Sequence, residues 1–100
     1  MAIGISRHGS QLVTADGVLG ISGTAKFVYG IHIISAATGA VVNLRNGTLV
    51  TDTIYIAETG TASKGITFNY NEGFFFPAGC YVDVDANTTS VIVSYDECIV

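Results

Sequence analysis

The stretch AKFVYGIHIIS at residues 25–35 decides the fold class of this chain. Large apolar or aromatic side chains occupy every odd position from 27 to 33, and the opposite face is expected to carry Lys26, Val28, His32 and Ile34. Because successive side chains of a β-strand point to opposite faces, this two-residue period predicts a strand. Both faces are partly apolar, which is typical of a strand that is covered on both sides.

Similar short runs follow one another along the chain, separated by turn residues. Asp16-Gly17 and Asn46-Gly47 are the strongest turn signals, because both dipeptides favour the type I′ turns of β-hairpins. No stretch shows convincing helical periodicity, and helix-forming residues are sparse. The predicted strands lie at residues 11–15, 18–21, 25–35, 40–45, 49–58, 66–70, 80–86 and 91–98.

About eight short strands at roughly ten-residue spacing, with no helix between them, predict one all-β domain. We expect a single antiparallel β-sandwich over residues 11–100, and we favour a jelly-roll-like arrangement. Residues 1–10 show no sustained alternation, so they are predicted to form an extended N-terminal arm. Ile3 and Ile5, with Arg7 beside them, would suit addition of this arm as a strand to a neighbour. Simple disorder is the alternative for the arm.

The composition indicates that part of the surface is an interface. Hydrophobic residues make up 49% of the 100 residues and charged residues only 12%, against a usual charged share of about 25%. Most of a small domain is surface, so these charges are too few to cover it. We therefore expect apolar surface that neighbouring molecules cover.

Two classes of partner are set aside on the sequence alone. The four basic residues are spread along a chain of net charge −4, whereas nucleic-acid binding requires concentrated positive charge. No apolar run approaches the roughly 20 residues that span a bilayer, and the N-terminal MAIGISRHGS lacks the pattern of a secretory signal. We expect no nucleic-acid partner, no membrane partner, and synthesis in a cytosol.

No group of residues predicts catalysis or a cofactor. His8 and His32 have no acidic residue near them in sequence, and the His and Cys residues lack the spacing of a zinc site. No glycine pattern has the context of a phosphate-binding loop. The sequence therefore predicts a non-enzymatic protein with no catalytic, cofactor-binding or metal-ligating residues. A metal site formed by either histidine across a symmetry axis is the alternative.

Four acidic residues crowd the last two predicted strands: Asp83, Asp85, Asp96 and Glu97. Carboxylates two residues apart on a strand point the same way but lie about 7 Å apart, and no loop is present that would wrap a calcium ion. Acidic side chains on strands also prevent edge-to-edge aggregation. The pattern favours a solvated acidic face, with a calcium site or a neighbour's basic patch as the alternatives.

The two cysteines are predicted to be reduced. Residues 80–86 and 91–98 are predicted to form a hairpin joined by residues 87–90. The register that keeps their valines on one face points Cys98 to the face opposite Cys80. A disulfide requires Cβ atoms about 3.5–4.5 Å apart, which this register does not allow. A β-bulge near Asp96 would change the register and permit the bond.

The triplet Phe74-Phe75-Phe76 is the most informative feature for a binding role. Neighbouring side chains of a strand alternate faces, so at least one of the three must point away from the domain's own core. One interpretation is a strand that is buried on both sides; we favour an apolar patch that docks a second subunit. The candidate partner interface comprises Ile3, Ile5, Arg7, Phe74, Phe75 and Phe76.

Three motifs give the chain a likeness to a known group of proteins: IISAATGAVVNLRNGT (33–48), GFFFPAGCYVDV (73–84) and SVIVSYD (90–96). They combine a strand with a Thr-Gly-Ala turn, a Leu-Arg-Asn-Gly-Thr hairpin, a Phe-Pro corner and a closing valine-rich strand. From about residue 25 onward, the chain resembles small proteins encoded among the structural genes of tailed phages. The motifs consist of strand and turn residues and carry no catalytic signature.

This resemblance implies a capsid decoration (cement) protein or a small tail or fibre component, often a homotrimer. Its partners would be the major capsid protein or other virion proteins, and its location the virion, after assembly in the host cytoplasm. The main expectation is a decoration protein that stabilises the capsid shell by binding its assembled state. The alternative is a tail or fibre component or a glycan-binding adhesin, in which Tyr55 or Tyr81 beside Asp83 or Asp85 would contact a sugar.

Overall fold

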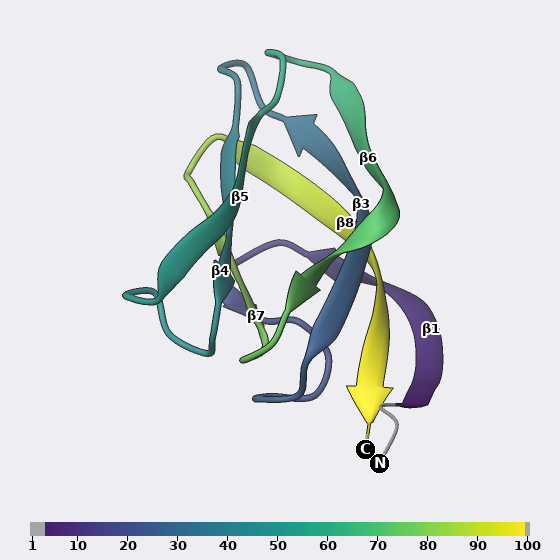
Figure 1. Ribbon diagram of the computed structural model, residues 1–100. Helices are drawn as coiled ribbons and strands as arrows, with labels where there is room; N and C mark the ends of the chain where they lie inside the picture. The colour runs from purple at the N-terminus through teal and green to yellow at the C-terminus, as the bar shows by residue number, and fades with distance from the viewer. Residues whose placement is uncertain (1–3, 100) are drawn as a thin grey trace.

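The computed structural model of the chain describes residues 4–99, and the side chains of residues 9–98. These residues form two four-stranded antiparallel sheets (Figure 1). They contain no helix, and hence none that could cross a membrane. The first sheet has the order β1-β8-β3-β6 and the second sheet the order β2-β7-β4-β5. The strands are β1 (Gly4–Val13), β2 (Gly17–Val18), β3 (Lys26–Ser35), β4 (Val41–Asn46), β5 (Thr53–Thr59), β6 (Gly65–Phe76), β7 (Cys80–Val84) and β8 (Thr88–Ile99).

The chain is arranged like a long hairpin that is folded back on itself. β4 pairs with β5, β3 with β6, β2 with β7 and β1 with β8, and all four pairs are antiparallel. Two further antiparallel pairs, β3 with β8 and β4 with β7, join these arms into the two sheets. Strands that follow one another in sequence therefore lie mostly in different sheets (Figure 1).

The core lies between the sheets and contains aliphatic side chains from both. Ile31 and Ile33 come from the first sheet and Val42, Leu44 and Val82 from the second, and all five are at most 1% exposed. Burying a side chain of this size stabilises the fold by about 1.5–3 kcal/mol. The predicted all-β class, with two antiparallel sheets around one core, is confirmed.

The prediction that residues 80–86 and 91–98 form a hairpin is wrong. β7 lies in the second sheet between β2 and β4, whereas β8 lies in the first sheet between β1 and β3. Val82 and Val91 are both buried, as expected, but they reach the core from opposite sheets. Alternation along a strand identifies its inward face and does not distinguish a hairpin from a crossover, so the sequence pattern fits both arrangements.

Residues 4–10, predicted to be part of an arm outside the domain, instead belong to β1. This segment pairs with β8 from Gly4↔Ile99 to Ser10↔Ser94, and the pairing continues to Val13. Backbone hydrogen bonds to β8 hold the segment, and such bonds do not require alternating apolar side chains. The absence of alternation is therefore compatible with a strand at the margin of a sheet.

A bulge in β3 exchanges the two faces of that strand. The register with β8 shifts between Val28 and Gly30, so Tyr29 is the extra residue. Up to Val28 the even-numbered side chains are buried, and from Ile31 onward the odd-numbered ones are. The prediction that Phe27 shares a face with Ile31 is wrong for this reason.

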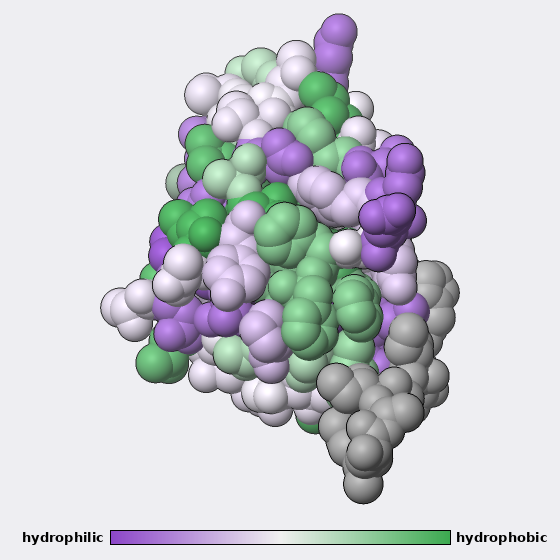
Figure 2. Space-filling model, in the orientation of Figure 1, coloured by the Kyte–Doolittle hydropathy of each residue, from purple (hydrophilic) through white to green (hydrophobic). Residues whose placement is uncertain are grey.

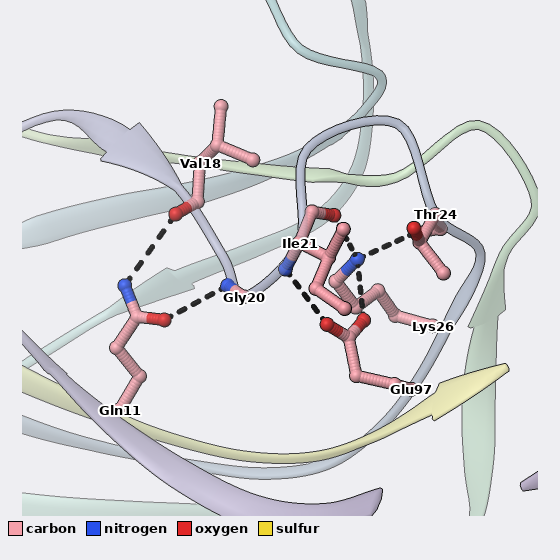
Figure 3. Close-up of polar contacts among 7 residues, drawn as sticks. All are labelled: Gln11, Val18, Gly20, Ile21, Thr24, Lys26 and Glu97. Carbon is pink, nitrogen blue, oxygen red and sulfur yellow. Dashed lines mark hydrogen bonds and ion pairs between the residues drawn. The ribbon is translucent and has the colours of Figure 1, made fainter. Parts of the chain in front are cut away.

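A fully buried ion pair lies beneath the loop between β2 and β3 (Figure 3). Lys26 and Glu97 are cross-strand partners on β3 and β8, and Lys26 Nζ lies 2.7 Å from Glu97 Oε1. The ammonium also donates to the carbonyl oxygens of Ile21, at 2.7 Å, and Thr24, at 2.6 Å, while Glu97 Oε2 accepts a hydrogen bond from Ile21 N at 2.7 Å. The ammonium therefore has two hydrogen bonds and an ion pair with Glu97, and a buried charge is tolerated only when it is paired in this way.

Candidate interaction surface

The described surface carries few charges. Among the Asp, Glu, Lys and Arg side chains of residues 9–98, only Asp16, Lys64 and Glu72 are exposed. The others are buried or half-buried: Lys26, Arg45, Asp52, Glu58, Asp83, Asp85, Asp96 and Glu97. The composition already provides few charged residues, and folding leaves only three of those in the described part of the chain exposed.

Large apolar side chains are exposed instead. Scattered exposed apolar residues are normal on a soluble protein, whereas contiguous groups mark interaction sites. Three groups are found in the described residues, one at the side of the sandwich, one on a loop and one on the outer face of the first sheet. The exposed residues are Leu12, Ile21, Ile34, Val41, Leu49, Val50, Ile54, Tyr55, Phe74, Phe75 and Ile92.

The first group, which we call the aromatic edge, consists of Tyr55 and Phe74, which lie where the margins of the two sheets meet, and of Phe75, which lies next to Phe74 on the opposite face of β6. Tyr55 is on β5 and the two phenylalanines are on β6, and these are the marginal strands of their sheets. The ring of Tyr55 lies 6.0 Å from that of Phe74 and 5.4 Å from that of Phe76. Figure 2 shows a continuous hydrophobic patch on this side of the molecule.

The three consecutive phenylalanines have different environments. Phe76 is fully buried in the core, whereas Phe74 is 39% and Phe75 is 40% exposed. Phe75 packs against Phe27 on the outer face of the first sheet, with ring centroids 4.9 Å apart. The geometric part of the prediction is confirmed, because the domain's own core holds only one of the three rings completely.

Tyr70 and Glu58 bridge β6 and β5 on the same side of the sandwich. Tyr70 Oη donates a hydrogen bond of 2.6 Å to Glu58 Oε2. Burial, and after it this hydrogen bond, raises the pKa of Tyr70 above its usual value. The bridge fixes the two marginal strands relative to each other and so gives the aromatic edge a defined shape.

The second group, which we call the apolar tip, is Leu49 and Val50 in the loop between β4 and β5. Leu49 is 60% exposed and Val50 is 49% exposed. The loop that carries them is ordered by Asp52, whose Oδ2 accepts hydrogen bonds of 2.9 Å from both Thr48 N and Leu49 N. Asp52 N donates to Leu49 O at 3.0 Å, and Arg45 Nη1 donates to Asp52 O at 2.9 Å. The loop thus presents two apolar side chains in a fixed conformation.

Replacing Asp52 with alanine is expected to loosen the apolar tip. The substitution leaves two amide groups of the loop without their acceptor, and loss of such charge-assisted bonds lowers the free energy of unfolding by about 1–2 kcal/mol. Urea denaturation measures this loss, and hydrogen exchange should show faster exchange at Thr48 and Leu49. Asp16, whose carboxylate accepts one bond from Val84 N, provides the control, because D16A should leave exchange in the tip unchanged.

The third group lies on the outer face of the first sheet. Leu12 of β1 and Ile92 of β8 are cross-strand neighbours, and Ile92 also neighbours His32 of β3. Leu12 is 62% exposed, Ile92 37% and Ile34 36%. His32 Nδ1 is 2.7 Å from Thr67 Oγ1 on β6, so the row ends in a hydrogen-bonded polar pair.

The predicted interface residues of the N-terminus are only partly described. Ile3 lies outside the described residues. Ile5 and Arg7 belong to β1 through their backbone, and their side chains lie outside the described part of the structure. β8 and β3 lie between residues 5 and 7 and the phenylalanines of the aromatic edge, because β1 and β6 are opposite margins of the first sheet.

The acidic residues predicted to form one face are dispersed instead. Asp83 lies in the second sheet, where its Oδ2 accepts hydrogen bonds from Arg45 Nη2 at 2.9 Å and Arg45 Nε at 3.2 Å. Asp85 caps the turn after β7, accepting from Asn87 N and Thr88 Oγ1. Asp96 is buried on β8. The prediction of a shared solvated acidic face is wrong because β7 and β8 belong to different sheets.

Both cysteines are free thiols and both are buried, which agrees with the predicted reduced state, although the hairpin register from which that state was predicted does not form. Cys80 is part of the core, and burial raises its pKa from 9.0 to about 12, although the nearby Lys26 acts in the opposite direction. Burial also raises the pKa of Cys98. A thiol must ionise to act as a nucleophile, so neither cysteine is suited to that role.

Alkaline pH is expected to destabilise the protein through Cys80. The folded state keeps a proton up to about pH 12 that the unfolded state loses near 9, so stability is complete below about pH 9 and falls above it. This single group lowers the free energy of unfolding by about 1.4 kcal/mol per pH unit in that window. Urea denaturation at several pH values between about 7 and 10.5 measures the slope, and C80A should have a shallower one. Equal slopes for the two proteins would contradict the assignment.

The described residues contain no group of three His, Cys, Asp or Glu side chains that could hold a metal ion, and no pocket is found among them. The polar groups near the three apolar groups are bound to one another, as in the pair of Arg45 with Asp83 and that of Tyr70 with Glu58. This arrangement is suited to docking against another surface.

Two parts of this surface were missed in the sequence. Leu49 and Val50 follow the Asn46-Gly47 turn signal, and the sequence predicts that they begin a strand, but β5 begins only at Thr53. The signal that identifies the loop is Asp52, which can cap a turn three or four residues earlier. Leu12 was assigned to a short strand, and nothing in its local pattern indicates that β1 lies at a margin.

No family model, no curated protein and no solved structure was found to match this chain.

Proposed function

We propose that this protein is a non-enzymatic structural component of a phage virion, a capsid decoration protein that binds and stabilises the shell formed by the major capsid protein. The observation that carries the proposal is the exposure of aromatic and aliphatic side chains on a surface with only three exposed charges in the described residues. The phage resemblance of the motifs at 33–48, 73–84 and 90–96 supports the location in a virion.

The strand order supports a jelly roll as the finer description of the fold. In a jelly roll, an antiparallel hairpin of eight strands is rolled so that its arms divide between two four-stranded sheets. The pairs β1–β8, β2–β7, β3–β6 and β4–β5, divided between the two sheets in the order described above, follow this plan. Jelly rolls are frequent in viral capsid and lectin domains, and fold alone does not select between these functions.

The apolar tip and the aromatic edge are the proposed docking surface. Their five side chains are 38–60% exposed and together offer roughly 400 Å² of apolar surface, which corresponds to about 10 kcal/mol of gross hydrophobic gain when covered. Association itself costs about 4–15 kcal/mol. One such contact is therefore weak, and a homotrimer that makes several contacts at once would bind much more tightly.

Binding to capsids tests the proposal directly. Purified protein is mixed with expanded capsids of the virus that encodes it, prepared without this protein, and binding is measured by cosedimentation and by the temperature at which the shell is disrupted. We expect saturable binding and a higher disruption temperature. L49D and V50D should weaken binding at least tenfold, whereas T61D, an exposed position in the loop after β5, should not.

Copy number separates a capsid protein from a tail or fibre component. Quantitative mass spectrometry of purified virions should give a number of copies that matches the capsid lattice. A few copies per particle, or absence from the particle, would overturn the proposal of a decoration protein.

A further inference from the structure

The two sheets have four marginal strands, and three of them are protected against pairing with another chain. β2 is only two residues long. β5 carries a register shift, because Leu44 pairs with Ile56 and Arg45 pairs with Ile54. The pairing of β6 with β3 is interrupted at residues 70–73, which have no cross-strand partner on β3 in the register and include the positive-φ Gly73. Short strands and bulges are the usual devices that prevent strand addition.

β1 is protected only near its start, where its register with β8 shifts between Ile5 and Arg7. It is ten residues long, and its pairing with β8 then runs without a shift from Arg7↔Glu97 to Val13↔Val91. Within the described residues β1 pairs only with β8 and lies at the margin of the first sheet (Figure 1). The N–H and C=O groups on its other side therefore have no partner strand in the described residues. Leu12, on this strand, is the most exposed large apolar side chain described. A long regular margin with an exposed leucine is a template for an added strand.

We propose that two copies of this chain associate through β1, which pairs antiparallel with β1 of the second copy about a two-fold axis and joins the two first sheets into one eight-stranded sheet. The proposal concerns a second copy of this chain and goes beyond the proposed capsid function, on which it does not depend.

The charge distribution favours a second copy as the occupant. A two-fold contact places the same surface of both molecules together, so charges on it repel. The ionisable residues of β1 are Arg7 and His8, and residues 9–13 carry no ionisable side chain. Of the exposed charges, Lys64 precedes β6 and Glu72 lies within it, at the opposite margin of the first sheet, while Asp16 lies beyond the end of β1. Two chains of net charge −4 therefore meet through strands that carry no acidic side chain.

The described side chains of β1 point to two faces: Gln11 toward the domain's own loop, and Ser10 and Leu12 toward solvent. Gln11 is turned to the loop after β2, where its Oε1 accepts a hydrogen bond of 2.8 Å from Gly20 N (Figure 3). Ser10 and Leu12 lie on the other face and are exposed. Substitutions at Ser10 and Leu12 therefore change the margin without breaking contacts that hold β1 to its own domain.

The size of the contact predicts a weak dimer. Ten strand residues extend over about 34 Å, and a single pair of strands covers less than the roughly 800 Å² per partner of a standard interface. We therefore expect a reversible monomer–dimer equilibrium that sedimentation equilibrium detects between micromolar and millimolar protein concentration.

Matched lysine substitutions identify the surface. S10K/L12K places charges on β1 and should raise the dimer dissociation constant at least tenfold, because lysine on a marginal strand opposes strand addition. I34K places a charge on the same outer face but on the interior strand β3, and I54K places one beside the aromatic edge; both should dimerise like the unchanged protein. Circular dichroism and thermal unfolding verify that each variant is folded.

Hydrogen exchange provides the second measurement. Amides of residues 9–13 should become more protected as the protein concentration rises, whereas those of β5 and β6 should not change. A monomer at every concentration overturns the proposal. Equal loss of dimer in I34K would assign the contact to the outer face of the sheet, and loss in I54K would assign it to the aromatic edge; either result also overturns it. Capsid binding is measured separately, so failure of the dimer and failure of the decoration function are distinguishable.

Discussion

Replacing Lys26 with methionine lowers the free energy of unfolding by about 3–5 kcal/mol, which is a large part of the roughly 5–15 kcal/mol that stabilises a small domain. The substitution preserves the length of the side chain but leaves Glu97 as a fully buried charge, since both side chains are 0% exposed. It also removes the donor that binds the carbonyl oxygens of Ile21 and Thr24. Chemical denaturation measures the loss, and hydrogen exchange in residues 20–25 should accelerate.

A double substitution shows whether the stability lost in K26M comes from leaving Glu97 as an unpaired buried charge or from losing the contacts of Lys26. In K26M/E97M the buried charge is gone, and replacement of both members of a buried pair by apolar residues is often neutral or stabilising. We expect the double variant to recover at least half of the stability lost in K26M. The half-buried pair of Arg45 and Asp83, whose side chains are 17% and 21% exposed, is the control, because R45M should cost about 1 kcal/mol or less. A loss below about 1 kcal/mol in K26M would contradict the buried pair.

The sequence predicts the strands better than it predicts their arrangement. A two-residue period is a local property, and it identifies the strand at 25–35 and the inward valines of β7 and β8. The bulge at Tyr29 inserts one residue and reverses the faces of that strand, and no local pattern marks it. Lys26 therefore lies on the buried face with Val28, where Glu97 and the carbonyl oxygens of Ile21 and Thr24 compensate its charge.

The candidate surface is predictable to a similar extent. Alternation alone requires that the phenylalanine triplet divide between two faces, and the structure places Phe76 inside and Phe75 outside. The position of Tyr55 beside Phe74 depends on two marginal strands that are brought together by the topology. The contact between Tyr55 and Phe74 cannot be predicted from the local sequence, because strand order is set by packing of the whole chain.

Replacing Phe76 with alanine should lower the free energy of unfolding by about 3–5 kcal/mol, because it leaves a cavity in the core where the ring is fully buried. F75A should cost only about 0.5–1.5 kcal/mol, the contribution of an exposed aromatic pair, since Phe75 contacts Phe27 and solvent. The two residues are neighbours of one type on one strand, so the comparison isolates burial from local strand preference. Urea denaturation of both variants measures the difference.

Capsid binding by the variants of the phenylalanine triplet distinguishes a ring that packs in the core from a ring that contacts a partner. F75A and F74A remain folded if these rings serve mainly as contact surface, and each should weaken capsid binding at least tenfold at temperatures where the variant is fully folded. F76A, studied below its lower melting temperature, should bind nearly as well as the unchanged protein, because its ring does not reach the surface. Should F74A and F75A bind capsids normally while losing as much stability as F76A, the exposed rings would be part of the domain's own packing. The aromatic edge would then not be a docking surface.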